Sequence, residues 1–439
     1  MDLLTGNIRR LYTRYLAAAF GSALISSIYG MVDMAMVGQY QGPDGAAALA
    51  VVAPVWNIIY SLGLLTGIGG SVIFSARRGS AQAGDENEYF TSAVIGSAIL
   101  SVLAWLWILT CERQVLLFFG ADETLLPLAL SYLRPIKCVF PLFLISQLLT
   151  SFLRNDNRPG LATAAVLTGG IFNIFGDWFC VFVLDLGVFG AGLATSIGAV
   201  MSLFVMLSHF LSKKCTLRLV RVSDLFKKLR EIAVTGFSSF FVDIAMGILT
   251  VLFNRQIMKY LGADALAVYA AIINISTFVQ CCAYSVGQAA QPIISTNFGA
   301  GNSARIRQTL RLALGATALF ALFWTGLSEA FPNLYVYIFM RPTPGTLAAA
   351  PAMVRCYALS FLLLPLNIFS TYYFQSILRP GDSFIVSIAR GLVVSGALIL
   401  ALPALAGPES LWLAMPITEL VTSVYAVFAM RRDTRALDA

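Results

Sequence analysis

The stretch YQGPDGAAALA, residues 40–50, recurs as YLGADALAVYA at residues 260–270, in register and without a gap. The offset, from position 40 to position 260, is 220 residues. One residue out of this register, the tripeptide RPG occurs at 158–160 and again at 379–381. Matches between small residues are common in membrane sequences, so each pair alone is weak evidence. Because the matches share one offset over a long span, the sequence predicts a duplicated unit.

The composition places both copies in a membrane. Of the 439 residues, 58% are hydrophobic and 12% are charged, whereas soluble domains carry about 25% charged residues. Apolar runs recur along the chain, each near the ~20 residues that cross the ~30 Å hydrocarbon core as a helix. The runs do not alternate over about ten residues, as barrel strands would. The sequence predicts an all-α polytopic membrane protein with twelve transmembrane helices, at 15–38, 47–76, 89–110, 126–152, 160–184, 188–211, 230–258, 265–297, 306–327, 351–378, 383–404 and 409–430.

The repeat fixes the expected symmetry of these helices. The offset spans six helices, an even number, so both copies enter the membrane in the same orientation. We therefore expect two six-helix bundles related by a pseudo-twofold axis along the membrane normal. The first lobe comprises residues 1–211, a basic connector spans 212–230, and the second lobe comprises 231–439. Two such bundles facing one another leave a central cleft, which is typical of transporters.

The net charge of +7 reflects topology. Most of the 29 lysines and arginines lie in the loops on the side that carries the two termini. By the positive-inside rule, both termini are predicted to be cytoplasmic. This distribution gives no sign of a nucleic-acid-binding surface. The single histidine, His209, lies at a helix end beside Lys213 and Lys214, where we expect an exposed residue with a structural role.

Four oxygen-bearing side chains fall in one layer of the first lobe. At 1.5 Å per residue, Asp33 lies ~8 Å and Asp177 ~10 Å below the outer boundary, and Thr195 lies ~12 Å deep. Asn173 lies one turn further in than Asp177 and shares its helix face. Ionised carboxylates in hydrocarbon cost several kcal/mol each unless they are paired, hydrated or protonated. A simpler alternative is that Asn173 and Thr195 only hold helices together, while Asp177 reaches up to the membrane interface.

Two carboxylates with an amide and a hydroxyl oxygen form a hard, oxygen-only site. Such a site suits a proton or an alkali cation and does not suit zinc, because no thiolate or imidazole is near. The sequence therefore predicts no metal other than Na⁺ at these oxygens, no catalytic residues and no organic cofactor. The coupling ion is H⁺ or Na⁺, and the residue types do not decide between the two.

Four segments of the chain resemble the multidrug and toxic compound extrusion (MATE) exporters, in the bacterial branch often called DinF-like. They are VDMAMVGQYQG at 32–42, FNIFGDWFCVFVLDLGVFGAGLATSIG at 172–198, VGQAAQPIISTNFGAGN at 286–302 and LWLAMPITELVTS at 411–423. The resemblance covers nearly the whole chain. It implies two six-helix lobes, alternating access and cation-driven export of amphipathic, often cationic compounds. It also implies a cation site at the matching residues Asp33, Asn173, Asp177 and Thr195.

The second lobe offers weaker candidates. Asp243 and Glu419 are its deep carboxylates, and either could assist with cations or could pair with a neighbouring helix. Amides, aromatic rings and methionines that line a cleft could hold a flat cation. The candidate substrate contacts are Met31, Met34, Asn274, Gln280, Tyr284, Gln288, Gln291 and Tyr372.

Two other functions are weighed against an exporter. A lipid-linked saccharide flippase of the same superfamily should carry basic residues in its cleft, but Arg134, Lys137, Arg255 and Arg355 lie near outer helix ends. An intramembrane aspartyl protease would use a pair of acids, but Phe175-Gly176 before Asp177 lacks the GxGD pattern and the duplication is left unexplained. The sequence thus predicts a monomeric, multi-pass exporter of the bacterial cytoplasmic membrane whose partners are small organic substrates and the lipid bilayer.

Overall fold

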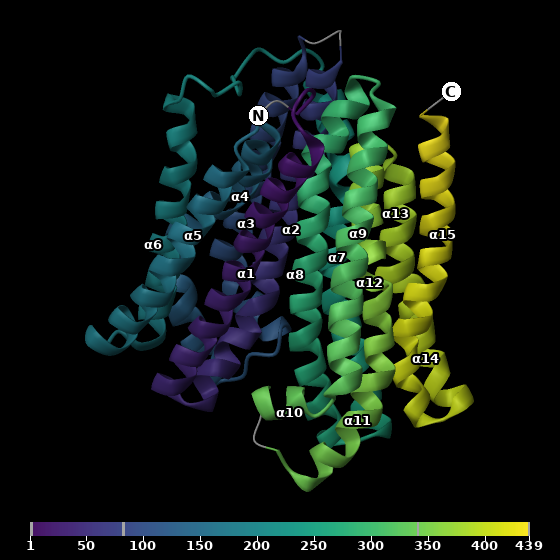
Figure 1. Cartoon of the computed structure of the whole chain (residues 1–439). Helices are drawn as coiled ribbons and strands as arrows, with labels where there is room; N and C mark the ends of the chain where they lie inside the picture. The colour runs from purple at the N-terminus through teal and green to yellow at the C-terminus, as the bar shows by residue number, and fades with distance from the viewer. Residues whose placement is uncertain (1–2, 81–83, 340–341, 438–439) are drawn as a thin grey trace. The chain divides into compact units, whose positions relative to one another are not determined.

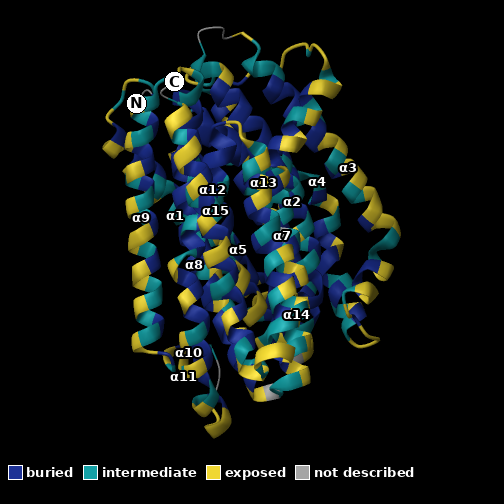
Figure 2. Ribbon diagram, turned by 90° about the vertical axis from the view of Figure 1, so that its right-hand side faces the viewer, coloured by how far each residue is buried: buried dark blue, intermediate teal, exposed yellow. Residues whose placement is uncertain are grey.

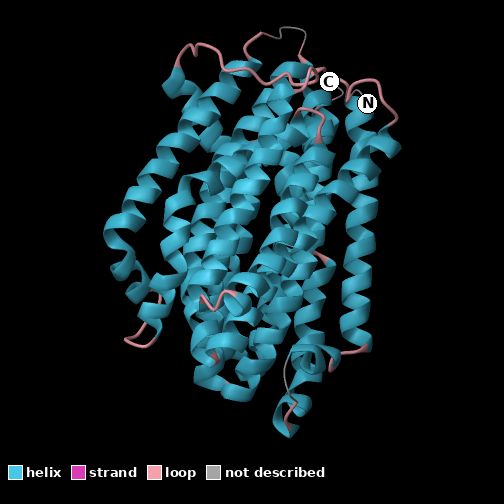
Figure 3. Cartoon of the chain, turned by 90° about the vertical axis from the view of Figure 1, so that its left-hand side faces the viewer, coloured by secondary structure: helices cyan, strands magenta, loops and turns pink. Residues whose placement is uncertain are grey.

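The computed structural model describes residues 3–80, 84–339 and 342–437, without the side chains of Pro43, Asp243 and Ala263. It contains twelve helices long and apolar enough to cross a membrane. No strand occurs among the described residues (Figure 3). The predicted all-α architecture is confirmed, and each predicted span lies within or close to an observed one.

The first half of the chain supplies six membrane helices and the beginning of a seventh. Two of the six end in a short η segment, so that α5 continues into η1, which is a π-helix, and α6 continues into η2. The elements are α1 (Ile8–Gln41), α2 (Pro43–Gly79), α3 (Glu86–Phe118), α4 (Leu125–Asn155), α5 (Pro159–Trp178), η1 (Phe179–Val183), α6 (Gly187–Leu207), η2 (Ser208–Leu211) and α7 (Leu225–Tyr260) (Figure 1).

The second half is more segmented. Its last three membrane helices are built from α11, η3 and α12, from α13, η4 and α14, and from η5 and α15. The elements are α8 (Ala263–Gly299), α9 (Ser303–Ala330), α10 (Leu334–Phe339), α11 (Pro344–Ala358), η3 (Leu359–Leu362), α12 (Leu364–Ser376), α13 (Pro380–Ile388), η4 (Ala389–Val393), α14 (Val394–Ala406), η5 (Pro408–Leu413) and α15 (Ala414–Ala436).

Two compact units divide the chain, and two helices belong to both. The first unit contains Ala17–Phe240 and the second contains Leu3–Leu16 with Phe241–Ala439. The division therefore falls inside α1 and inside α7, whereas the sequence analysis placed it in the connector at 212–230. Positions 17 and 241 lie within about one helical turn of the repeat offset. The two copies of the repeat thus share their first helices in the same way.

The beginning of each shared helix is well packed in its unit. Leu11, Tyr12 and Tyr15 of α1 are buried in the second unit against residues of α8 that include Ile293. Ile232 of α7 is buried in the first unit. The described ends of the chain lie at the same end of the second unit (Figure 3).

Helix contacts within the first unit depend on glycine. Exposed apolar residues run along outer helices such as α3 (Figure 2), so lipid covers these faces and supplies no hydrophobic force between helices. Close backbone approach replaces that force. A Cβ on Gly236 of α7 would collide with the carbonyl oxygen of Leu65 in α2. A Cβ on Gly69 of α2 would collide with the carbonyl oxygen of Ile232 in α7, so the two glycines form a reciprocal contact.

The Gly236→Ala variant should therefore destabilise the protein by at least ~2 kcal/mol, because a methyl group has no room beside Leu65. Gly247→Ala is the matched control in the same helix, since a Cβ there would meet nothing within 4 Å. The control should be neutral or gain up to about 1 kcal/mol from helix propensity. Thermal unfolding of the purified proteins in detergent measures both. Equal midpoints for the two variants would contradict the proposed contact.

Candidate cation site

The four residues expected at the site come together inside the first unit, in the company of a tyrosine. Asp33 lies on α1, Asn173 and Asp177 on α5, Thr195 on α6, and Tyr132 on α4. All five side chains are buried, and Asp177 has no exposed surface. Four helices therefore each contribute to one polar cluster in an apolar bundle.

Hydrogen bonds connect the cluster in two groups. The Tyr132 hydroxyl donates to Oδ2 of Asp33 over 2.6 Å. The Asn173 amide nitrogen lies 3.0 Å from the Thr195 hydroxyl and 3.4 Å from Oδ1 of Asp177. The charges of Asp33 and Asp177 also interact with one another. The two groups thus belong to one electrostatic unit.

The acceptors in the cluster outnumber its donors. Among the described residues, Oδ1 of Asp33, Oδ1 of Asn173 and Oδ2 of Asp177 are buried without a hydrogen-bond partner. No ion pair of the described residues includes Asp33 or Asp177. Buried polar atoms are nearly always hydrogen-bonded, and unpaired buried charge is costly. Three orphaned oxygens beside two acids fit a bound proton or a hard cation.

Small residues allow the helices that carry these side chains to meet. A Cβ on Gly192 of α6 would collide with the carbonyl oxygen of Tyr132 in α4. Where α5 crosses α6, a Cβ on Gly169 would lie 2.7 Å from the carbonyl oxygen of Gly198, and the reverse holds at the same distance. Directly after Asp177, α5 changes into the π-helical η1, and π turns occur frequently at functional sites.

Tyr132 is the residue that sequence reasoning missed. It is seven residues inside the outer end of α4, so the same depth count would have placed it ~10 Å deep, in the layer of the other four. Tyrosine is common in membrane helices, and nothing local in the sequence distinguishes this one. The contact between α4 and α1 is needed to reveal it.

In the second unit, Glu419 is a compensated charge and not an open site. The Arg390 Nε donates to Oε1 of Glu419 over 2.7 Å, and the Asn367 amide donates to Oε2 over 2.6 Å. Glu419 is fully buried and Arg390 is 5% exposed. The sequence analysis considered Glu419 as an aid to cations and did not single out Arg390, which lies in the π-helical η4. The observed ion pair favours the structural reading of Glu419.

The candidate substrate contacts are scattered over both units. Met31 and Met34 of α1 are exposed, and so is Asn274 of α8. Gln280 is buried and donates to the Ser276 hydroxyl over 3.3 Å. The remaining candidates are Tyr284 and Gln288, which are half-buried, and Gln291 and Tyr372, which are buried. The rings of Tyr284 and Tyr372 lie 6.3 Å apart, edge to face. The side chain of Asp243 lies outside the described residues.

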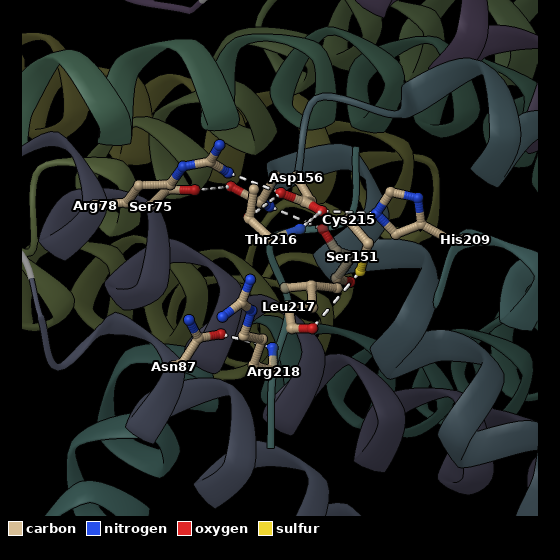
Figure 4. A network of polar contacts seen from close by, with 11 residues as sticks. Ser75, Arg78, Asn87, Ser151, Asp156, His209, Cys215, Thr216, Leu217 and Arg218 are labelled. Atoms are coloured by element: carbon tan, nitrogen blue, oxygen red, sulfur yellow. Dashed lines mark hydrogen bonds and ion pairs between the residues drawn. The ribbon is translucent and has the colours of Figure 1, made fainter. Parts of the chain in front are cut away.

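Asp156 marks a second polar cluster in the first unit, at the end of α4. Arg78 of α2 donates to its Oδ1 over 2.8 Å, and His209 of η2 lies 2.6 Å from its Oδ2. The backbone N–H of Thr216 donates to Oδ2 over 3.0 Å, and the Thr216 hydroxyl donates to Oδ1. Figure 4 shows the carboxylate between Arg78 on one side and the His209 ring on the other. The expectation of an exposed histidine is wrong, because His209 is 1% exposed.

This cluster is a structural junction. One ligand atom each from Asp156, His209 and Cys215 lies within 4.8 Å of the others, as metal ligands would. However, four protein donors already occupy the lone pairs of the carboxylate, and one of them is a cationic guanidinium. Burial also raises the pKa of the Cys215 thiol, which disfavours the thiolate that a metal needs. The cluster instead fixes the start of the connector.

The rest of the connector is bound to the first unit as well. The backbone N–H groups of Arg218, Val220 and Ser223 donate to side chains of α3, over 2.6–3.0 Å. Lys228, in the first turn of α7, lies 3.1 Å from Glu88 of the same helix. The segment between η2 and α7 is thus a strap laid along one unit, and not a free linker.

Replacing Glu419 tests the ion pair of the second unit. Glu419→Gln should cost about 3–5 kcal/mol, because Arg390 stays buried without its counter-charge. Adding Arg390→Gln should recover most of that loss, since two neutral amides need no compensation. Thermal unfolding of both variants in detergent measures the difference. A double variant no more stable than Glu419→Gln would contradict the pairing.

Replacing Asp156 tests the junction. Burial alone would raise the pKa of Asp156, but bonds from His209 and Thr216 and the charge of Arg78 outweigh it and hold the pKa below its ordinary value. A lowered carboxyl pKa stabilises the fold at neutral pH, and this contribution disappears as pH falls through that pKa. Asp156→Asn should lose ~3 kcal/mol at pH 7 and should show a flatter dependence on pH below about 4.

The control for this experiment is Glu123→Gln, which removes an exposed carboxylate in the loop before α4. Unfolding midpoints of the wild type and the two variants, measured between pH 3 and pH 7, give the comparison. Parallel curves for wild type and Asp156→Asn would refute the role of the charge. A drop in the wild-type midpoint on adding a chelator would show instead that a metal occupies the junction.

Comparison with known proteins bears on the whole chain. A family model described as MatE matches it twice, at residues 18–179 and 238–398. The two ranges begin 220 residues apart, which confirms the duplication read from the sequence. The multidrug export protein MepA of Staphylococcus saprophyticus is 24% identical over 380 residues, covering 85% of this chain and 82% of the relative. That of Staphylococcus haemolyticus is 23% identical over 409 residues, covering 92% and 89%.

Solved structures agree on the fold. A multidrug resistance MATE family transporter of the MOP superfamily, in its outward-facing conformation, has a TM-score of 0.90 at 21% identity, over 99% of this chain and 98% of that one. A MOP superfamily transporter from Pyrococcus furiosus has a TM-score of 0.90 at 20% identity, over 100% and 98%. With both halves matched by the family model, this chain belongs to the MATE family of membrane transporters, and it is not an enzyme.

Proposed function

We propose that this protein exports small organic compounds across the bacterial cytoplasmic membrane in exchange for H⁺ or Na⁺, with both termini in the cytoplasm. Family membership and relatives named as multidrug export proteins support export. The concentration of lysine and arginine on the side of the termini supports the orientation. The coupling to an ion rests on one observation, the buried pair of uncompensated acids at Asp33 and Asp177.

Each residue of the cluster has a role in this proposal. Asp33 and Asp177 exchange the cation, because they carry the charge that the cation neutralises. Asn173 and Thr195 orient Asp177 and offer further oxygens to Na⁺. Tyr132 is a positioning residue, since its hydroxyl holds Asp33. When the acids release their cation, the charge left in the membrane interior drives rearrangement or rehydration of the site.

Helix α1 supplies a route from the ion to the transport cycle. It carries Asp33 in the first unit, while its first residues, up to Leu16, belong to the second unit. A cation that binds Asp33 more tightly in one arrangement of α1 shifts the population toward that arrangement. By linkage, that arrangement of the protein also binds the cation more tightly. Because α1 is common to both units, its arrangement is felt in both.

The substrates are proposed to be amphipathic and often cationic. A flippase for pyrophosphate-linked lipids would need basic charge free for its substrate. In the second unit, the buried Arg390 has its charge balanced by Glu419. This balance favours an exporter of organic cations over a flippase. The exposed methionines of α1, Met31 and Met34, offer an adaptable apolar surface to such compounds.

The test is export by purified protein in liposomes with the two ion gradients imposed separately. Asp33→Asn and Asp177→Asn should each reduce gradient-driven export of a fluorescent organic cation about tenfold or more, in line with a coupling of 1–3 kcal/mol. Tyr132→Phe should have a smaller effect, and Glu123→Gln should behave as wild type. Undiminished gradient-driven export by both Asn variants would refute ion coupling at this site. The gradient that supports wild-type export identifies the ion.

A further inference from the structure

A basic cavity lies in the second unit, away from every residue discussed for transport. It has a volume of about 440 Å³ and is lined by Arg9 of α1 and by Ala304, Arg307, Gln308, Arg311 and Leu312 of α9. Both the start of α1, which belongs to this unit, and the start of α9 are membrane-helix ends on the side that carries the termini. The cavity therefore lies at the membrane boundary of that side.

The α9 residues of the cavity form one face of the helix. Ala304, Arg307 and Gln308, followed by Arg311 and Leu312, are spaced as residues that share a face over the first turns of a helix. Arg9 faces them from the first turn of α1. Two arginines one turn apart and a third from another helix converge on one volume, with an amide between them. A glycerol backbone or the start of an acyl chain could pack against Leu312 and Ala304.

The two walls of the cavity are fixed to one another. Arg305, in the first turn of α9, donates to the carbonyl oxygens of Leu3 and Gly6 over 3.0 and 2.8 Å. Its Nε donates to Oδ1 of Asn297 over 3.0 Å. This guanidinium fastens the segment before α1 to the start of α9. The cavity is thus a built feature of the unit, held by buried hydrogen bonds beneath the exposed arginines.

The charge of the cavity is uncompensated. Its lining contains three arginines and no acidic residue. None of the ion pairs among the described residues includes Arg9 or Arg311. Three guanidinium groups around one space repel each other unless an anion lies between them, and arginine forks match the oxygens of phosphate.

We propose that this cavity binds a phosphate-bearing anion, either the headgroup of an acidic phospholipid or a soluble phosphate. Arg307 and Arg311 hold the phosphate oxygens from α9, Arg9 holds them from α1, and Gln308 donates to a further oxygen. Basic pockets between membrane helices on the cytoplasmic side are suited to anionic headgroups. A bound headgroup would stabilise the contact between α1 and α9. The proposal does not depend on ion coupling at Asp33.

The test uses the purified full-length protein in detergent. Phosphatidylglycerol, phosphatidylcholine and glycerol phosphate are titrated separately, and binding is measured by native mass spectrometry and by the shift in unfolding temperature. The variant is Arg307→Gln with Arg311→Gln. The matched control is Lys213→Gln with Lys214→Gln, which removes the same charge from the exposed start of the connector. Phosphatidylglycerol should bind wild type and control, and the variant should bind it about tenfold or more weakly.

The outcomes separate the sources of the anion. Binding of phosphatidylglycerol alone identifies a lipid headgroup site, and binding of glycerol phosphate with the same loss in the variant identifies a site for a soluble phosphate. Equal weakening in variant and control, or no weakening in the variant, overturns the proposal. If the double variant does not fold, Arg9→Gln on the opposite wall decides the question, because its exposed side chain has no ion-pair partner among the described residues. Unchanged affinity in Arg9→Gln would also overturn the proposal.

Discussion

The constraint on which the candidate site depends is the cost of unpaired negative charge in a low-dielectric interior. Asp33 and Asp177 are buried among apolar helices, and no basic residue of the described chain pairs with either. A protein that kept both acids ionised and alone would lose several kcal/mol for each. The charge must therefore be balanced by something that comes and goes. An ion from solution is the simplest such partner, and its arrival and departure change the stability of the helices around it.

Two other buried acids in the same chain show what compensation looks like when it is permanent. Glu419 has Arg390 and Asn367 on its two oxygens. Asp156 accepts from Arg78, His209 and Thr216, and these donors use all of its lone pairs. Both carboxylates are as deeply buried as Asp33, yet neither has room for a guest. The comparison within one molecule separates acids that build the fold from acids that remain available for chemistry.

The duplicated scaffold gives this chemistry its mechanical setting. Each copy of the repeat begins with a helix whose first part packs in one unit and whose remainder packs in the other. The connector does not serve as a loose joint, because Asp156 and the side chains of α3 bind it along the first unit. The passages between the units thus lie within α1 and α7. A charge change at Asp33 acts on one of these two shared helices.

The sequence alone determined the twelve helices, the repeat and the layer in which Asp33, Asn173, Asp177 and Thr195 lie, because hydrophobic length, offset and helical rise are local quantities. It could not determine that Tyr132 joins Asp33, that Arg390 balances Glu419, or that His209 is buried against Asp156. These contacts join helices that are 29 to 99 residues apart in the chain. Nor did it place the division between units inside α1 and α7. Only tertiary packing selects which faces of the helices meet, because glycine contacts such as that of Gly192 with Tyr132 set the approach of the backbones.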